Sequence, residues 1–200
     1  SVIWSPRSNI SLYGHTAQVP MMAKVGVSIA LGTDWTASGS INLLRELQCA
    51  ADLNEKQFGN FFTARDLWQM VTFNAALATA TNDVLGQIAV GKMGDLSIFI
   101  GKPDRQEHQA VVRAGVEDVA LVLRSGLPMY GDATVLEALG ATDAGKCEVL
   151  DVCGVSKRIC AERETGKKLA DLETAAVKPI YQLFGCGVPS KEPTCVPYRE

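Results

Sequence analysis

The sequence has little that would suit nucleic-acid binding or a membrane span. Lysine and arginine number 19 against 22 aspartates and glutamates, so no basic excess exists to neutralise phosphates. Aromatic residues make up only 6% of the chain, which argues against a base-stacking surface. The longest apolar runs, such as residues 25–31, are far too short to cross a bilayer. We therefore expect neither a nucleic-acid partner nor a membrane span.

Familiar catalytic patterns are also scarce. The chain has two histidines and no HxH or HExxH pattern, whereas a hydrolytic metal site usually needs several histidine ligands. It has no GxSxG elbow and no P-loop. What remains is a globular composition, 47% hydrophobic and 20% charged over 200 residues, enough for one large domain or two small ones. Taken alone, the chain lacks a complete active site.

The start of the chain is strand-like. It begins at Ser1 without a methionine and runs at once into the apolar triplet Val2-Ile3-Trp4, with no polar lead-in or helix cap. We expect the chain to be the C-terminal portion of a longer protein. The alternative is a short protein whose first strand follows a processed N-terminus.

Five of the six cysteines fall in the last third of the chain, at Cys147, Cys153, Cys160, Cys186 and Cys195. Their even number and clustering predict disulfides and an oxidising compartment, either periplasmic or secreted. Reduced thiols in a cytoplasmic protein are the alternative, and the absence of CxxC makes a zinc site a weak interpretation. The shortest loops predict the pairs Cys153–Cys160 and Cys186–Cys195.

Apolar periodicity organises the first part of the chain. Residues 2–5 form a strand-like run that Pro6 stops, residues 16–25 show helical spacing, and residues 27–31 form a second buried run. Strand, helix and strand within about thirty residues predict a βαβ unit with parallel strands. Because both runs are apolar nearly throughout, the strands should be covered on both faces.

Further along, a core-facing helix with an apolar stripe over residues 43–51 is predicted, with Ser40 as its cap. Thr63 and Asp66 resemble a capping box before the next helix. The period then changes, and we predict a hairpin of residues 87–90 with 96–100, a strand at 119–123 and an amphipathic segment at 169–184. The order of these segments favours helices first and an antiparallel β module after them.

Asp34 is the strongest candidate for chemistry, because it follows the second strand at the carboxyl end where α/β sheets bind ligands. A carboxylate there can ligate a metal and accept a proton, or it can simply cap the loop. His15 follows the first strand and could contact substrate, or it could be an exposed loop imidazole. Trp35 could wall a substrate pocket or pack the loop. Ser8 is expected to pin the first loop through backbone hydrogen bonds.

Five segments together resemble the metal-dependent amidohydrolases, most closely their deaminase and chlorohydrolase branch. Their order and spacing over residues 2–130 carry the resemblance. The segments are Ser5-Pro6-Arg7-Ser8-Asn9-Ile10-Ser11-Leu12-Tyr13-Gly14, Gly26-Val27-Ser28-Ile29-Ala30-Leu31-Gly32-Thr33-Asp34-Trp35, Asn42-Leu43-Leu44-Arg45-Glu46-Leu47, Thr72-Phe73-Asn74-Ala75-Ala76, and Leu85-Gly86-Gln87-Ile88-Ala89-Val90-Gly91-Lys92-Met93-Gly94-Asp95-Leu96.

The resemblance implies an α/β fold: the C-terminal part of a (β/α)8 TIM barrel, comprising its last βαβ unit and helices, plus part of a small β-sandwich domain. The implied segments are 1–82 for the barrel part, 83–146 for the sandwich and 147–200 for a cysteine-bearing tail. Asp34 would be a metal ligand and the base that activates water, with zinc or another divalent metal as cofactor. The substrates would be small amides, cyclic amides or ureas, and amino-heterocycles, hydrolysed at a carbon–nitrogen bond.

The family's HxH and its middle-strand ligands have no counterpart in this chain. They are expected upstream of Ser1 or on a complementary chain, so the isolated chain should be inactive. A second interpretation is a non-catalytic structural or binding module that pairs with another chain, including a second copy of itself. A third is an enzyme of the same fold with a different reaction, such as a dipeptidase.

Overall fold

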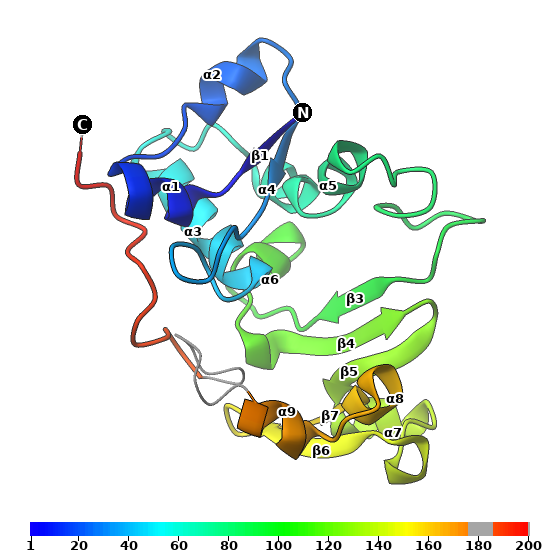
Figure 1. Ribbon diagram of the computed structural model, residues 1–200. Helices are drawn as coiled ribbons and strands as arrows, with labels where there is room; N and C mark the ends of the chain where they lie inside the picture. Colours follow the sequence, from blue (N-terminus) through cyan, green and yellow to red (C-terminus); the bar gives the residue numbers. More distant parts are fainter. Residues whose placement is uncertain (176–185, 200) are drawn as a thin grey trace. The chain divides into compact units, whose positions relative to one another are not determined.

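Two short strands near the start of the chain pair in parallel, as the periodicity predicts (Figure 1). In this computed structural model, which describes residues 1–175 and 186–199, β1 (Val2–Trp4) lies beside β2 (Ile29–Leu31) with Val2 opposite Ile29 and Trp4 opposite Leu31. The parallel register sends both strands out of the sheet at the same edge.

The connection between these strands holds two helices where one was predicted. Besides α2 (Val19–Lys24), residues expected to be a loop form α1 (Pro6–Tyr13). Pro6 stops the strand as expected, but a proline at the first helical position also starts a helix, because its missing N–H needs no partner there. Gly14 ends α1 in the left-handed conformation, with φ 85°.

The helices that follow build the core of this part. They are α3 (Leu43–Lys56), α4 (Ala64–Met70), α5 (Phe73–Ala78) and α6 (His108–Val112). Asn42 caps α3 by accepting a hydrogen bond from the Arg45 N–H, so the expectation that Ser40 is the cap is wrong. The capping box of Thr63 and Asp66 is confirmed at α4. Buried apolar side chains from these elements form one cluster, which includes Trp4, Ile10, Leu47, Leu53 and Met70.

The parallel sheet has two strands among the residues that the structure describes, and no described strand pairs with its outer edges. A closed barrel is therefore not present within residues 1–175 and 186–199. This is consistent with the prediction that the chain supplies only part of a barrel, because two strands cannot close one.

A second, antiparallel sheet has the order β3-β4-β5-β7-β6 (Figure 1). Its strands are β3 (Leu96–Phe99), β4 (Val119–Arg124), β5 (Leu127–Asp132), β6 (Glu148–Val152) and β7 (Val155–Ile159). Short helices accompany them: α7 (Ala133–Ala138), α8 (Ala161–Thr165), α9 (Leu169–Ala175) and 3-10 turns at Val116–Asp118 and Asp143–Gly145. Among the described residues, the strands β3 to β7 form a single sheet and not a sandwich of two.

The predicted hairpin of residues 87–90 with 96–100 is wrong. Residues 87–90 form no strand, and β3 pairs instead with β4, more than twenty residues later. Likewise β7 pairs with β5, so residues 155–159 lie inside the sheet and not in a separate tail. Both errors have one cause: a local pattern cannot show which distant strand supplies the hydrogen bonds. Of the amphipathic segment 169–184, α9 is observed, and residues 176–184 lie outside the described residues.

The chain divides into two compact units, each with its own hydrophobic core. Unit 1 comprises Ser1–Lys92, Lys102–Arg113 and Lys191–Glu200, and unit 2 comprises Met93–Gly101 and Ala114–Ser190. Their boundaries differ from the predicted segments 1–82, 83–146 and 147–200, because the last residues join the parallel part. None of the helices in the described part of the chain is both long and apolar enough to cross a membrane.

All six cysteines form disulfides, but neither predicted pair is correct. The bonds are Cys49–Cys195 in unit 1, and Cys147–Cys160 and Cys153–Cys186 in unit 2. Short loops favour a pairing only when nothing else brings cysteines together, and here the packed elements decide which ones meet.

A buried lysine joins three segments of unit 2. The Lys157 side chain on β7 is fully buried, and its ammonium group donates to the carbonyls of Glu117 and Val119 and to the carboxylate of Asp132. Asp132 also contributes, after burial, to raising the pKa of Tyr130 from 10.0 to about 12. These contacts fasten β7 to the β4 and β5 side of the sheet.

Replacing this lysine should destabilise unit 2. Lys157→Met removes the ammonium group and leaves the Asp132 carboxylate and two carbonyls without their partner, which should cost about 3 kcal/mol of unfolding free energy. Urea denaturation measures the change, with Lys167→Met at an exposed position as the control. Equal stability of the two variants would contradict this role of Lys157.

Candidate functional site

Asp34 lies just beyond the sheet, at the edge where functional loops are expected. It follows β2 by three residues, at the carboxyl end of a parallel strand. Its side chain is exposed, and its backbone has a positive φ of 56°. Non-glycine residues seldom adopt this left-handed conformation, and such positions concentrate at functional sites.

Ser8, in the first turns of α1, orients the Asp34 carboxylate. The Ser8 hydroxyl is buried and donates a hydrogen bond of 2.7 Å to Oδ2 of Asp34. It also lies 2.9 Å from the hydroxyl of Ser38. The sequence suggested backbone contacts for Ser8, whereas the structure shows this direct contact with the carboxylate. The predicted parallel pairing could have indicated this contact, because it brings the residues after each strand to the same edge of the sheet.

The loop of residues 33–40, called the Asp34 loop below, folds tightly on itself. The Gly39 N–H donates to the carbonyl of Trp35 at 2.7 Å, and a Cβ added at Gly39 would lie 1.8 Å from the carbonyl oxygen of Thr33. Only glycine fits this close approach. Trp35 lies next to Asp34 with its side chain 69% exposed, so it is available to wall a pocket at this edge.

Arg7 holds the other end of the Asp34 loop. Its side chain is buried, and Nε donates to the Ser40 hydroxyl at 2.7 Å. Its backbone N–H donates to Oε1 of Glu46 at 3.0 Å. Burial raises the pKa of Glu46 above its usual 4.5, and the contacts with Ser40 and Arg7 offset this only in part. Arg7 and Ser8 thus fix the Asp34 loop at two points.

His15 follows α1, and the one hydrogen bond described for its ring is with the carbonyl of Thr16 at 3.2 Å. The residues between β1 and His15 form α1, which carries the chain about 12 Å along the helix axis. His15 is exposed and lines a hollow of about 430 Å³ with Gln57, at the end of α3, and Arg199.

The other histidine is packed within unit 1. His108 opens α6, and its ring meets that of Trp68 edge to face, with centroids 4.9 Å apart. His108 thus lies at a helix start held by an aromatic contact.

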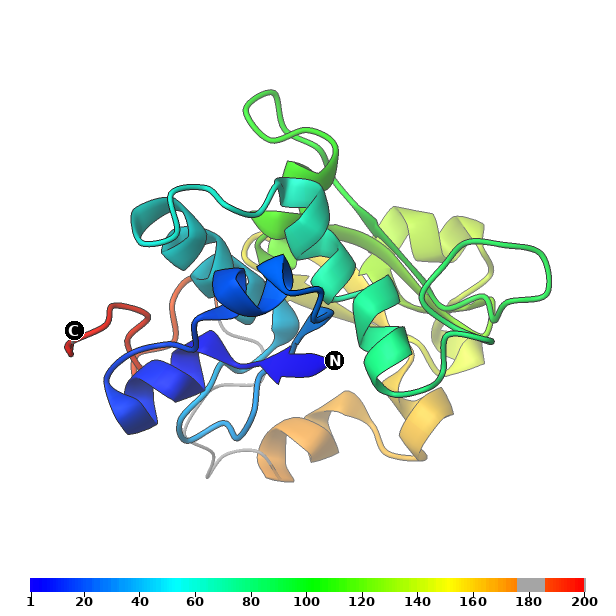
Figure 2. The same cartoon turned by 90° about the horizontal axis from the view of Figure 1, so that it is seen from above.

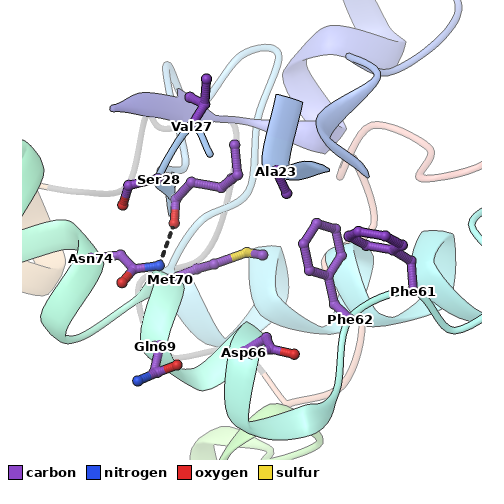
Figure 3. A pocket seen from close by; sticks show the side chains of 10 residues that line it. Ala23, Val27, Ser28, Phe61, Phe62, Asp66, Gln69, Met70 and Asn74 are labelled. Atoms are coloured by element: carbon purple, nitrogen blue, oxygen red, sulfur yellow. Dashed lines mark hydrogen bonds between the residues drawn. The ribbon is translucent and has the colours of Figure 1, made fainter. Parts of the chain in front are cut away.

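A second hollow, of about 320 Å³, lies at the beginning of β2 (Figure 3). Phe61, Phe62 and Met70 form an apolar side, and the Asn74 amide donates to the Ile29 carbonyl at 2.9 Å. Because this carbonyl lies on the edge of β2 that faces away from β1, Asn74 satisfies a group that a neighbouring strand would otherwise bind. Asp34 is at the other end of β2 and does not line this hollow.

The described residues supply one candidate metal ligand and not a complete site. Among them, no three His, Cys, Asp or Glu side chains come together in a way that could hold a metal. Asp34 itself suits a cation: it is exposed at the strand end, and the described hydrogen bonds reach only its Oδ2. The donor set therefore fits a divalent metal only if other ligands come from outside the described residues.

Glu46 should make the stability of unit 1 depend on pH. Because its pKa is raised in the folded state, that state binds the proton more tightly than the unfolded chain. This stabilisation is present below pH 4.5 and is lost as the pH rises through the raised pKa. In Glu46→Gln, thermal unfolding between pH 4 and pH 8 should show a smaller loss of stability with rising pH. Glu55→Gln, at an exposed position of α3, is the control, and equal pH slopes in both variants would contradict the assignment.

Residues 2–128 match the family model described as "Amidohydrolase family". A 5-methylthioadenosine/S-adenosylhomocysteine deaminase from Thermoanaerobacter pseudethanolicus is 34% identical over 118 residues, which cover 57% of this chain and 27% of the relative. One from Halobacterium salinarum is 37% identical over 146 residues, covering 68% and 33%.

The fold also resembles a crystal structure of an adenosine deaminase from Xanthomonas campestris with bound zinc. The TM-score is 0.58 at 26% identity, covering 64% of this chain and 31% of that one. The chain thus spans a third or less of the length of these relatives. With residues 2–128 matched, the chain belongs to the amidohydrolase family, in its deaminase and chlorohydrolase branch.

Proposed function

We propose that this chain is the C-terminal portion of a metal-dependent hydrolase that acts on carbon–nitrogen bonds of small molecules. The observation that carries the proposal is Asp34, a carboxylate at the carboxyl end of a parallel strand, held by Ser8 within the part of the chain that matches the family. The names of the relatives support deamination of purine nucleosides and related amino-heterocycles as the reaction class.

The chain's own residues have defined tasks in this proposal. Ser8 donates to Oδ2 of Asp34 and fixes the carboxylate plane, which leaves Oδ1 to bind a cation or to accept a proton. A divalent metal such as zinc, when bound, supplies Lewis-acid polarisation and makes water more acidic. Trp35, exposed beside Asp34, walls the substrate. His15 is exposed and lines a hollow with Gln57 and Arg199, and its contact with substrate stays a prediction.

In this proposal the remaining ligands come from outside the described residues, either from the same protein or from a complementary chain. The outer edges of β1 and β2 are where further strands would add, because backbone groups there lack a described strand partner. We therefore propose that the isolated chain is inactive. The three disulfides support a periplasmic or secreted location.

A non-catalytic module that pairs with another chain, a second copy included, is the second candidate. It is favoured by the described residues, which bring no three potential metal ligands together. Metal content of the complete assembly separates the two functions, since only the enzyme requires a metal with Asp34 among its ligands.

The test is to purify the protein with everything that stays bound to it, and to measure its native mass, denatured mass and metal content. The enzyme predicts additional barrel strands, a divalent metal, and release of ammonia from 5′-methylthioadenosine, S-adenosylhomocysteine or adenosine. Asp34→Asn should lower turnover by about 10²–10⁴-fold, because both ligand and proton acceptor are weakened.

Asp83→Asn is the matched control, since Asp83 is also an exposed aspartate and lies in the segment between α5 and β3. A complete assembly without metal would contradict the enzyme and favour the module. Turnover by the isolated 200 residues with zinc, abolished by Asp34→Ala, would contradict the proposed dependence on further strands.

A further inference from the structure

The C-terminal segment, residues 191–199, lies along α1 and α3 within unit 1 (Figures 1 and 2). Its Glu192 side chain is only 1% exposed, although it is charged. Glu192 accepts hydrogen bonds from Nε and Nη2 of Arg45 at 3.1 and 2.5 Å, and it lies 3.3 Å from Nη1 of Arg7. The next carbonyl, of Pro193, accepts from the same Nη1 of Arg7.

Two further attachments hold this segment. Cys195 is bonded to Cys49, which lies in α3 and is buried in the core of unit 1. The backbone N–H groups of Tyr198 and Arg199 both donate to the carbonyl of Gly14, at the end of α1, over 2.9 and 3.0 Å. The segment is thus fixed to α3 by a covalent bond and to α1 by hydrogen bonds.

These contacts lead to Asp34 through a short path. Arg7, which Glu192 and Pro193 contact, donates to Ser40 in the Asp34 loop. The adjacent Ser8 donates to Asp34. Arg7 and Arg45 carry two positive charges, and Glu46 supplies one of the two negative charges that balance them. Glu192 brings the other, so the segment supplies a carboxylate that pairs with both the buried Arg7 and the partly buried Arg45.

We propose that residues 191–199 form a strap that positions the Asp34 loop through Arg7, and that the Cys49–Cys195 bond makes this positioning sensitive to redox state. Arg7 and Glu192 are positioning residues that act through Ser8 and Ser40. The consequence for catalysis rests on the proposed function of Asp34, whereas the coupling between strap and loop does not.

The redox step is an ordinary thiol–disulfide exchange. Cys195 is half-buried, so a thiolate of dithiothreitol can attack its sulfur and displace the Cys49 thiolate. The second thiol of the reagent then closes its cyclic disulfide and releases Cys195. Two electrons pass to the protein, and both cysteines end as thiols. The Cys147–Cys160 bond in unit 2 is fully buried and should react more slowly.

Hydrogen exchange followed by mass spectrometry tests the coupling on the full chain. In Cys49→Ala/Cys195→Ala, amides of residues 5–14 and 33–40 should exchange about tenfold faster, because strap release lowers the cost of opening them locally. The matched control is Cys153→Ala/Cys186→Ala, which removes a disulfide of the other unit and should leave these segments unchanged. Wild type treated with dithiothreitol should follow the first variant, and reoxidation should reverse the change.

A second variant keeps the disulfide and tests the charge. Glu192→Gln should raise exchange in the same two segments, and Glu192→Asp should restore most of the protection. The exposed neighbour gives the control, Lys191→Gln. Unchanged exchange in both strap variants would overturn the proposal. So would equal acceleration throughout α3 and α4, which would make the segment a general stabiliser of unit 1.

The two proposals fail separately. If the strap is not coupled to the Asp34 loop, the strap variants show unchanged exchange rates. The metal content of the assembly, and the loss of turnover in Asp34→Asn relative to wild type, would still be as expected. Absence of metal and turnover in the complete assembly would remove the enzymatic role of Asp34 and leave the exchange result standing.

Discussion

The parallel pairing of β1 with β2 is the constraint on which the candidate site depends. A parallel register brings both strand exits to one edge, so the helix start at Pro6 and the loop at Asp34 must leave side by side. Ser8 can therefore reach a carboxylate 26 positions later in the sequence. An antiparallel pairing of the same segments would put these two residues at opposite ends of the sheet, and the hydrogen bond between them could not form.

Around this edge, charged groups take the place of apolar packing. Burying Arg7 and Glu46 costs desolvation energy, and their mutual attraction offsets it only when the remaining donors and acceptors are satisfied. The raised pKa of Glu46 shows that burial is not fully compensated. Such a network instead fixes the geometry of the groups around it, because the planar guanidinium can donate hydrogen bonds in only a few directions. Arg7 can bind Ser40, Glu192 and Pro193 together in one geometry, and that geometry fixes the Asp34 loop.

Sequence patterns predicted the parts of this arrangement that are local. The βαβ unit follows from two apolar runs separated by a segment with helical spacing. The capping box follows from the position of Asp66 three residues after Thr63. The position of Asp34 follows from the end of a strand. Helix α1 was missed because Pro6 both stops a strand and starts a helix, and only the packing of Ile10 decides between them. The pairing of β7 with β5 and the disulfides Cys49–Cys195 and Cys153–Cys186 were missed because their partners are distant in sequence. The Cys147–Cys160 bond spans 13 positions and was missed because Cys153–Cys160 would close a shorter loop. Ser8 was predicted in part: its position after the first strand follows from the local pattern, but its contact with Asp34, 26 positions away, does not.

Under the proposed function, the origin of the groups around Asp34 explains how one piece of a barrel could hold an oriented ligand without a complete active site. Barrel enzymes draw their catalytic groups from several strands, so a single strand pair supplies only its own share. The groups that support Asp34, namely the hydroxyl of Ser8, the closed turn at Gly39 and the guanidinium of Arg7, all lie within unit 1. Supporting contacts of this kind set the orientation of a ligand before the metal binds. In the proposed enzyme, the Asp34 carboxylate would therefore be oriented by this chain, while the number of ligands, and with it the chemistry, would be decided by what joins the outer edges of β1 and β2.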